Sequence, residues 1–128
     1  RALTYAVNDP TVEWIKENSR GDEIFLTDMY YLHPILLSGR KVFYGWPYYA
    51  WSAGYDMKRE NEVRTMFETV DSEERKKMLS QKRIGYIVID DGLRRADWVR
   101  VREDLIADEF DVVYLRKVPD NMKIYKVE

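Results

Sequence analysis

The chain has 128 residues, of which 45% are hydrophobic and 34% are charged, and its charges nearly cancel to a net charge of −2 at pH 7. This composition is typical of one globular domain that can bury a core without disulfides or a structural metal. The balanced charge offers no basic surface for phosphate backbones, so nucleic acid is not expected as a partner. Because cysteine is absent from the sequence, a disulfide framework, a thiolate nucleophile and a cysteine-based zinc site are excluded.

The apolar runs are short compared with the roughly 18 to 20 residues that cross a bilayer. The sequence begins at Arg1 without a methionine or an apolar leader. We therefore expect residues 1–128 to form a single soluble domain that is cut from a longer polypeptide, here a longer membrane protein for the reasons given below.

The first predicted elements are a helix and a strand. Asp9 and Pro10 predict a helix start, because Asp accepts hydrogen bonds from the free amides of the first turn and Pro tolerates its missing N–H there. We expect this helix to end near Asn18. Residues 23–27 (EIFLT) predict a buried strand that ends at Asp28.

Two more short strands are predicted at 35–37 and 41–44, paired around Gly39 and Arg40. Residues 45–56 (GWPYYAWSAGYD) show no regular period and predict a loop. Beyond the loop, helical spacing predicts one helix over the region of Val63, Met66, Phe67 and Val70. A second helix starts at Asp71 with Glu74 in a capping-box-like pattern.

The last third of the chain contains the best strand, 84–89 (IGYIVI), which is fully apolar as a central strand should be. Asp90, Asp91 and Gly92 are expected to end it as a turn. Asp97 is expected to cap a last helix with an inward face of Trp98, Val101, Leu105 and Ile106. Strands near 111–116 and 122–127 predict an antiparallel hairpin.

Helices that alternate with apolar strands predict an α/β fold. Its expected architecture is a three-layer sandwich with a mixed, mainly parallel sheet and an antiparallel edge hairpin.

The aromatic loop is the first candidate site, because exposed Trp and Tyr rings are costly unless they cover an apolar surface or receive a flat partner such as a sugar ring. The alternative is that the rings fold back as a lid over the sheet. Arg40 and Arg59 flank the loop and are predicted either to grip a phosphate or carboxylate or to pair with Asp56 and Glu60. The substrate-binding candidates are Arg40, Trp46, Tyr48, Tyr49, Trp51, Tyr55, Asp56 and Arg59.

Three acidic residues form the second candidate site. Asp28, Asp90 and Asp91 follow predicted strands, and ligands of open α/β sheets bind beyond the carboxyl ends of the strands. If those strands are neighbours, the carboxylates converge and can hold a hard cation such as Mg²⁺ or bond to hydroxyls. The alternative is that they are ordinary turn and helix-entry residues.

Other chemistry is not indicated. His33 is the only histidine, and no Ser, Cys or second His stands at a motif spacing from it, which favours a packing or surface role. Glycine-rich phosphate loops, zinc spacings and nucleophile elbows are absent from the sequence, so no cofactor is expected and catalytic residues stay unassigned.

Read in order, WIKEN, EIFLTD, HPILLSGR, YGWPYYAWSAGYD and YIVIDD resemble the extracytoplasmic C-terminal domain of multi-spanning prokaryotic membrane proteins akin to the GT-C class of glycosyltransferases. The resemblance spans roughly residues 12–91 and centres on Gly39, Arg40, Gly45, Trp51 and Gly54. It implies a cell-membrane protein with this soluble domain on the extracytoplasmic side. The implied partners are the membrane-embedded part of the same chain and a glycan or polyprenyl-phosphate sugar.

Oligosaccharyltransferases, a related group, carry a Trp-Trp-Asp-Tyr-Gly signature that reads acceptor peptides. This sequence has WSAGYD at 51–56 instead, so acceptor-peptide recognition is not implied. The acidic catalytic residues of such enzymes lie in membrane-proximal loops outside this sequence.

Three hypotheses follow. The leading one is an accessory domain of a membrane-bound glycosyltransferase-like protein, whose aromatic loop contacts glycan, lipid headgroups or the membrane part. The second is a free-standing soluble metal-dependent enzyme that acts on a phosphorylated or sugar substrate. The third is a protein-interaction module whose aromatic patch docks a partner subunit.

Overall fold

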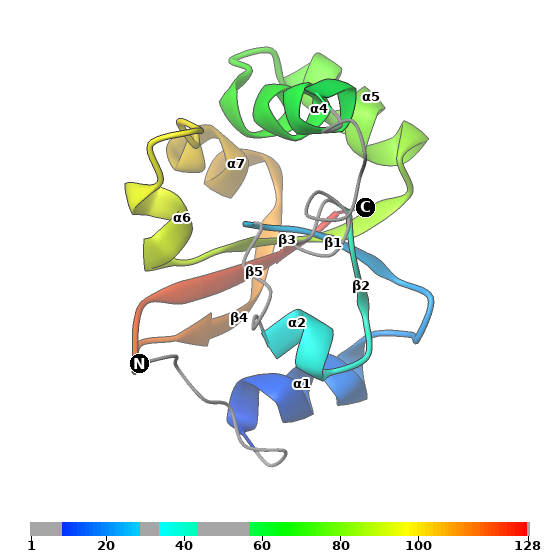
Figure 1. The fold of residues 1–128 in the computed structure, drawn as a ribbon, viewed down its shortest axis with the longest axis vertical. Helices are drawn as coiled ribbons and strands as arrows, with labels where there is room; N and C mark the ends of the chain where they lie inside the picture. The colour runs from blue at the N-terminus through cyan, green and yellow to red at the C-terminus, as the bar shows by residue number, and fades with distance from the viewer. Residues whose placement is uncertain (1–8, 29–33, 44–56, 128) are drawn as a thin grey trace.

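The computed structural model describes residues 9–28, 34–43 and 57–127, and these residues form a five-stranded sheet between two layers of helices (Figure 1). The elements are α1 (Pro10–Asn18), β1 (Ile24–Leu26), α2 (Pro34–Leu37), β2 (Lys41–Val42), α4 (Met57–Glu68), α5 (Ser72–Gln81), β3 (Ile84–Ile89), α6 (Asp91–Arg95), α7 (Glu103–Glu109), β4 (Asp111–Arg116) and β5 (Met122–Lys126). None of the helices described is long and apolar enough to cross a membrane.

The strand order is β2-β1-β3-β5-β4. β1 is parallel to both β2 and β3, whereas β5 is antiparallel to β3 and β4 is antiparallel to β5. The sheet is therefore mixed, and its antiparallel edge is the hairpin of β4 and β5. This arrangement confirms the predicted fold class.

The two helical layers enclose two separate cores, because alternate side chains of a strand point to opposite faces of the sheet. α4, α5, α6 and α7 cover one face, and α1 and α2 cover the other (Figure 1). On β3, Ile87 and Ile89 belong to the larger core under α4–α7, whereas Tyr86 and Val88 belong to the smaller core with Ile15 of α1. The fold is a three-layer α/β sandwich.

The predicted helix starts at Asp9 and Asp71 are confirmed. The Asp9 carboxylate accepts hydrogen bonds from the backbone N–H groups of Thr11 (2.8 Å) and Val12 (3.4 Å). Asp71 likewise accepts from the N–H groups of Glu73 and Glu74 at 3.0 and 3.1 Å. Local capping chemistry is thus enough to place both starts.

The strand predicted at 35–37 is wrong, because Pro34–Leu37 forms the short helix α2. Gly39 has a φ of +76°, and the N–H of Arg40 donates to the carbonyl of Ile35 at 3.1 Å. This is the six-to-one bond of a Schellman motif, in which a glycine in the left-handed region ends a helix. β2 consequently pairs with β1 rather than with 35–37.

The helix predicted from Asp97 is also wrong. The turn expected at 90–92 is instead the start of α6, and α7 begins only at Glu103. Between them, the carbonyl of Trp98 accepts from the Arg64 guanidinium (3.0 Å), and the N–H of Arg102 donates to Phe67 O (2.8 Å). These bonds to α4 use backbone groups that a helix would have paired internally.

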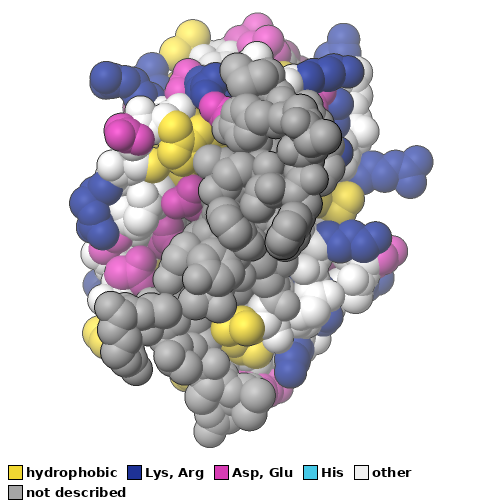
Figure 2. Space-filling model, in the orientation of Figure 1, with side chains coloured by type: hydrophobic (Ala, Val, Ile, Leu, Met, Phe, Trp, Pro, Cys, Tyr) yellow, Lys and Arg dark blue, Asp and Glu magenta, His cyan; other side chains and the backbone are white. Residues whose placement is uncertain are grey.

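Basic and acidic side chains both occur over the described surface of the face shown in Figure 2. The picture agrees with the balanced charge of the sequence.

Candidate functional site

The carboxyl ends of three neighbouring strands meet at one edge of the sheet, because β2, β1 and β3 are parallel. Asp28 follows β1, Phe43 follows β2, and Asp90 follows β3. The aromatic segment 45–56 comes directly after this end of β2 in the sequence. The topology therefore brings the carboxyl end of β2 to the same edge as Asp28 and Asp90, which is the edge where open α/β sheets bind ligands.

Asp28 and Asp90 lie against the same turn, the first turn of α6. A Cβ added to Gly92 would lie 3.5 Å from Asp90 Oδ1 and 3.8 Å from Asp28 Oδ2. Asp90 also caps α6, because its Oδ1 accepts from the N–H of Leu93 at 2.9 Å. Two of the three predicted acidic residues are therefore brought close together, with a glycine that leaves room between them.

Asp91 makes different contacts. One of its carboxylate oxygens pairs with Arg94 at 2.7 Å, and the other accepts from the N–H of Asn121 at 3.2 Å. The Asn121 N–H, and after it Arg94, hold the pKa of Asp91 below its usual range. Asp91 thus connects α6 to the β4–β5 hairpin.

A metal role for the acidic residues stays a prediction. Among the residues that the structure describes, no group of three or more His, Cys, Asp or Glu side chains is placed to hold a metal ion.

Arg94 is an organising residue that the sequence did not single out. Its guanidinium forms a bidentate pair with Glu103 (2.8 and 2.9 Å) and donates to the carbonyl of Asn121 at 2.7 Å. Glu103 is the main reason that the pKa of Arg94 is raised. Glu103 and Asn121 come from α7 and the hairpin, so local spacing could reveal only the Asp91–Arg94 pair and not these bonds, which connect α6 to both elements.

Arg59 lies where β2 ends. Its Nη1 donates to the carbonyl of Phe43 at 2.7 Å, and its guanidinium carbon lies 4.2 Å from the centroid of the Phe43 ring. Lys58, Glu62 and Lys82 line a small hollow of about 220 Å³ beside it. Arg59 therefore contacts Phe43, which precedes the aromatic segment in the sequence, and ligand binding by Arg59 stays a prediction.

Arg40 lies at the other end of β2 and is bonded to backbone and hydroxyl oxygens. It donates to Ser19 Oγ and Ser19 O, both at 2.9 Å, and to the carbonyls of Lys16 and Ser38, both at 3.2 Å. Lys16 and Ser19 belong to the C-terminal end of α1, where carbonyls lack helical partners. Arg40 thus caps α1 and connects it to β2, and its predicted role in anion binding is untested.

The other substrate-binding candidates lie outside the described residues, and their predicted roles stay predictions. They are Trp46, Tyr48, Tyr49, Trp51, Tyr55 and Asp56. The same holds for His33.

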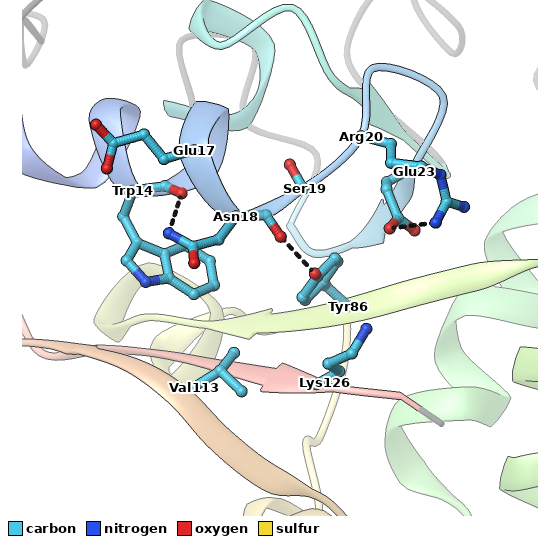
Figure 3. Close-up of a pocket in the computed structure, with 9 residues that line it drawn as sticks. All are labelled: Trp14, Glu17, Asn18, Ser19, Arg20, Glu23, Tyr86, Val113 and Lys126. Carbon is cyan, nitrogen blue, oxygen red and sulfur yellow. Dashed lines mark hydrogen bonds and ion pairs between the residues drawn. The ribbon is translucent and has the colours of Figure 1, made fainter.

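A second site, which sequence reasoning missed, is an open groove of about 580 Å³ on the α1 face of the sheet (Figure 3). Trp14 and Asn18 of α1 stand on one side of it, and Val113 and Lys126 stand on the other. Tyr86 of β3 lies between them. Because these residues come from opposite ends of the chain and share no motif, only the folded structure assembles them.

Comparison with known proteins shows a likeness in structure but none in sequence. No protein-family model matches the chain, and no curated protein matches it. The chain is similar in structure to the C-terminal globular domain of an oligosaccharyltransferase from Archaeoglobus fulgidus. The TM-score is 0.59 at 12% sequence identity, and the match covers 99% of this chain and 100% of that one. At this identity the likeness shows the fold.

Proposed function

We propose that this chain is an accessory domain of a membrane-bound glycosyltransferase-like protein that acts on lipid-linked sugars. The domain lies on the extracytoplasmic side of the cell membrane, and its aromatic segment contacts glycan, lipid headgroups or the membrane-embedded part of the same polypeptide. The observation that carries the proposal is the structural likeness to the C-terminal globular domain of an oligosaccharyltransferase over the full length of both chains.

The place of the aromatic segment in the sequence supports this function. It comes after β2, whose carboxyl end lies at the sheet edge of Asp28 and Asp90, and Arg59 donates to Phe43 O shortly before it. Aromatic rings suit both the flat C–H faces of sugars and the boundary between a membrane and water. A cation beside them suits the phosphate of a lipid carrier or headgroup.

Vesicle binding tests the contact with lipid. The 128-residue chain would be sedimented with phosphatidylglycerol vesicles, with and without a polyprenyl-phosphate-linked hexose. We expect the wild type to bind and the Trp46→Ala/Trp51→Ala variant to bind at least about tenfold more weakly. A tenfold change in affinity corresponds to roughly 1.4 kcal/mol, and burying two aromatic side chains contributes more than that.

The matched control is Trp98→Phe, since Trp98 packs against the larger core on the α4–α7 side of the sheet. Its vesicle binding should equal that of the wild type. A wild-type chain that stays in the supernatant with both kinds of vesicle would contradict contact between this segment and lipid.

A second candidate function, a metal-dependent soluble enzyme, is favoured by the convergence of Asp28 and Asp90 on Gly92. Thermal unfolding with and without Mg²⁺ or Mn²⁺ decides it. Metal binding would raise the melting temperature of the wild type but not that of Asp28→Asn. The control is Asp97→Asn, at an exposed aspartate, whose melting temperature would rise as in the wild type. If the metals change no melting temperature, this candidate is eliminated.

A further inference from the structure

We propose that the groove beside Trp14 binds a neutral oligosaccharide. The groove lies near the amino ends of β1 and β3, whereas Asp28 and Asp90 lie at their carboxyl ends. The inference therefore concerns a separate surface and does not depend on the proposed function.

The groove contains one partly exposed aromatic ring, that of Trp14, which is held by neighbouring rings. The Trp14 indole, which is partly exposed, lies 5.2 Å from the Tyr114 ring and 6.3 Å, edge to face, from the Tyr86 ring. Tyr86 is itself held by stacking on Phe25 at 4.8 Å and by a hydrogen bond from its hydroxyl to the carbonyl of Asn18 at 2.9 Å. Because Trp14 is held in place before binding, it loses little conformational entropy when a sugar ring packs on it.

Polar groups that are unpaired among the described residues lie in the groove with Trp14. Within the described part of the chain, the Glu17 carboxylate, the Trp14 indole N–H and the Lys126 ammonium make no hydrogen bond or ion pair. The Lys126 ammonium lies 4.8 Å from the centroid of the Tyr86 ring. The groove thus offers both an acceptor and donors, which is what a hydroxyl needs because it donates and accepts at once.

The charges of the groove favour a neutral ligand. The groove is lined by two acidic residues, Glu17 and Glu23, and by two basic residues, Arg20 and Lys126. Arg20 pairs with Glu23 at 3.5 Å. A polyanion would meet two carboxylates, and a polycation would meet two cations. A chain of uncharged sugars meets neither, and the groove of about 580 Å³ is open enough for more than one ring.

One close approach shapes the end of the groove. The Glu23 carboxylate lies directly over Gly85, where a Cβ would fall 2.5 Å from Glu23 Oε1. Any larger residue at position 85 would push Glu23 away from Gly85 and disturb its ion pair with Arg20. The absence of a side chain at Gly85 therefore leaves room for the Glu23 carboxylate in its present position, where it pairs with Arg20.

Nuclear magnetic resonance of the isotope-labelled 128-residue chain tests the proposal, because the Trp14 indole N–H gives its own signal. The ligands would be a tetramer of N-acetylglucosamine and a tetramer of mannose. We expect at least one to shift the Trp14 signal saturably. Glu17→Ala should weaken that binding about tenfold, since a hydrogen bond to a charged group contributes about 1.5 kcal/mol or more.

Glu13→Ala is the matched control, because Glu13 is an exposed glutamate of the same helix and does not line the groove. Its affinity should equal that of the wild type. Unchanged affinity in Glu17→Ala, or no saturable shift with either tetramer, would overturn the proposal. Tighter binding of a sulfated oligosaccharide or of an unstructured peptide would overturn it as well.

The Trp46→Ala/Trp51→Ala variant separates this proposal from the proposed function. It should bind the tetramer as tightly as the wild type even where it has lost vesicle binding. Conversely, Trp14→Phe should weaken binding of the tetramer, because it removes the indole N–H, and should leave vesicle binding unchanged.

Discussion

The two faces of the sheet are closed in different ways. Under α4–α7, the buried arginine Arg75 joins three helices. It donates to the carbonyl of Met66 at 2.9 Å and to the carbonyl of Thr69, and it pairs with Glu109 of α7. The carbonyls at the end of α4 lack helical partners, so one guanidinium satisfies them and fastens α5 and α7 at the same time.

On the opposite face, α1 and α2 leave part of the hairpin of β4 and β5 uncovered, and aromatic rings line the gap. Contact there is made by the faces and edges of Trp14, Tyr86 and Tyr114 rather than by a buried ion pair. The difference is one of contact chemistry: a buried ion pair joins the helices of the α4–α7 face, whereas aromatic contacts beside a groove hold α1.

The comparison predicts that the largest loss of stability comes from the closed face. Arg75→Met should lower the free energy of unfolding by about 3–5 kcal/mol, because it leaves the buried Glu109 carboxylate without its cation. Urea denaturation measures the change. Arg95→Met, at an exposed arginine, is the control and should cost less than about 0.5 kcal/mol. A loss below about 1 kcal/mol for Arg75→Met would show that the ion pair does not hold this face.

On the open face, Trp14→Ala should cost about 2 kcal/mol, because it removes two aromatic contacts from a side chain that is only partly buried. Trp14→Phe should recover more than half of the loss. The same urea experiment measures both. If Trp14→Ala cost as much as Arg75→Met, the proposed contrast between the two faces would be wrong.

Replacement of Tyr125 is expected to raise the stability of the fold rather than to lower it. The Tyr125 side chain is fully buried in the larger core, and its hydroxyl has no hydrogen-bond partner among the described residues. Tyr125→Phe should therefore raise the free energy of unfolding by about 1 kcal/mol at neutral pH, since the unpaired hydroxyl no longer has to be desolvated. A decrease in stability would indicate that the hydroxyl has a partner.

The same residue predicts a pH dependence. Burial raises the pKa of Tyr125, so the phenol stays neutral in the folded protein at a pH where the unfolded chain ionises it. The contribution of the neutral Tyr125 phenol to the free energy of unfolding is complete below about pH 10, and it is lost as the pH rises above that value. Stability measured from neutral to alkaline pH should fall less steeply in Tyr125→Phe than in the wild type.

The smallest expected effect on stability is that of Glu17→Ala, within about 0.5 kcal/mol, because Glu17 is exposed and makes no bond to the described residues. Loss of oligosaccharide binding without loss of stability would show that the open face is used for binding. A large loss of stability would assign Glu17 to the fold instead.

Local patterns predicted the elements whose causes are local. The apolar run 84–89 is β3, and Asp9 and Asp71 cap the helices that they were expected to start. The apolar run 35–37 predicts a strand but forms most of α2, because a run this short fits both structures and only the backbone of Gly39 shows the helix end.

The sites depend on distant parts of the chain, which limits what a sequence can predict. Asp28 and Asp90 could be placed at one sheet edge because each follows a strand. The groove could not be predicted, because Trp14 and Lys126 become neighbours only through the pairing of β3 with β5 and the packing of α1 on the sheet.

The most direct test of the proposed function is to sequence the gene upstream of the codon for Arg1 and to measure the hydropathy of the encoded protein. The proposal predicts many segments of about 20 apolar residues, as in a multi-spanning membrane protein. A start codon close to Arg1, with no such segments encoded, would contradict the proposal and direct attention to Asp28 and Asp90.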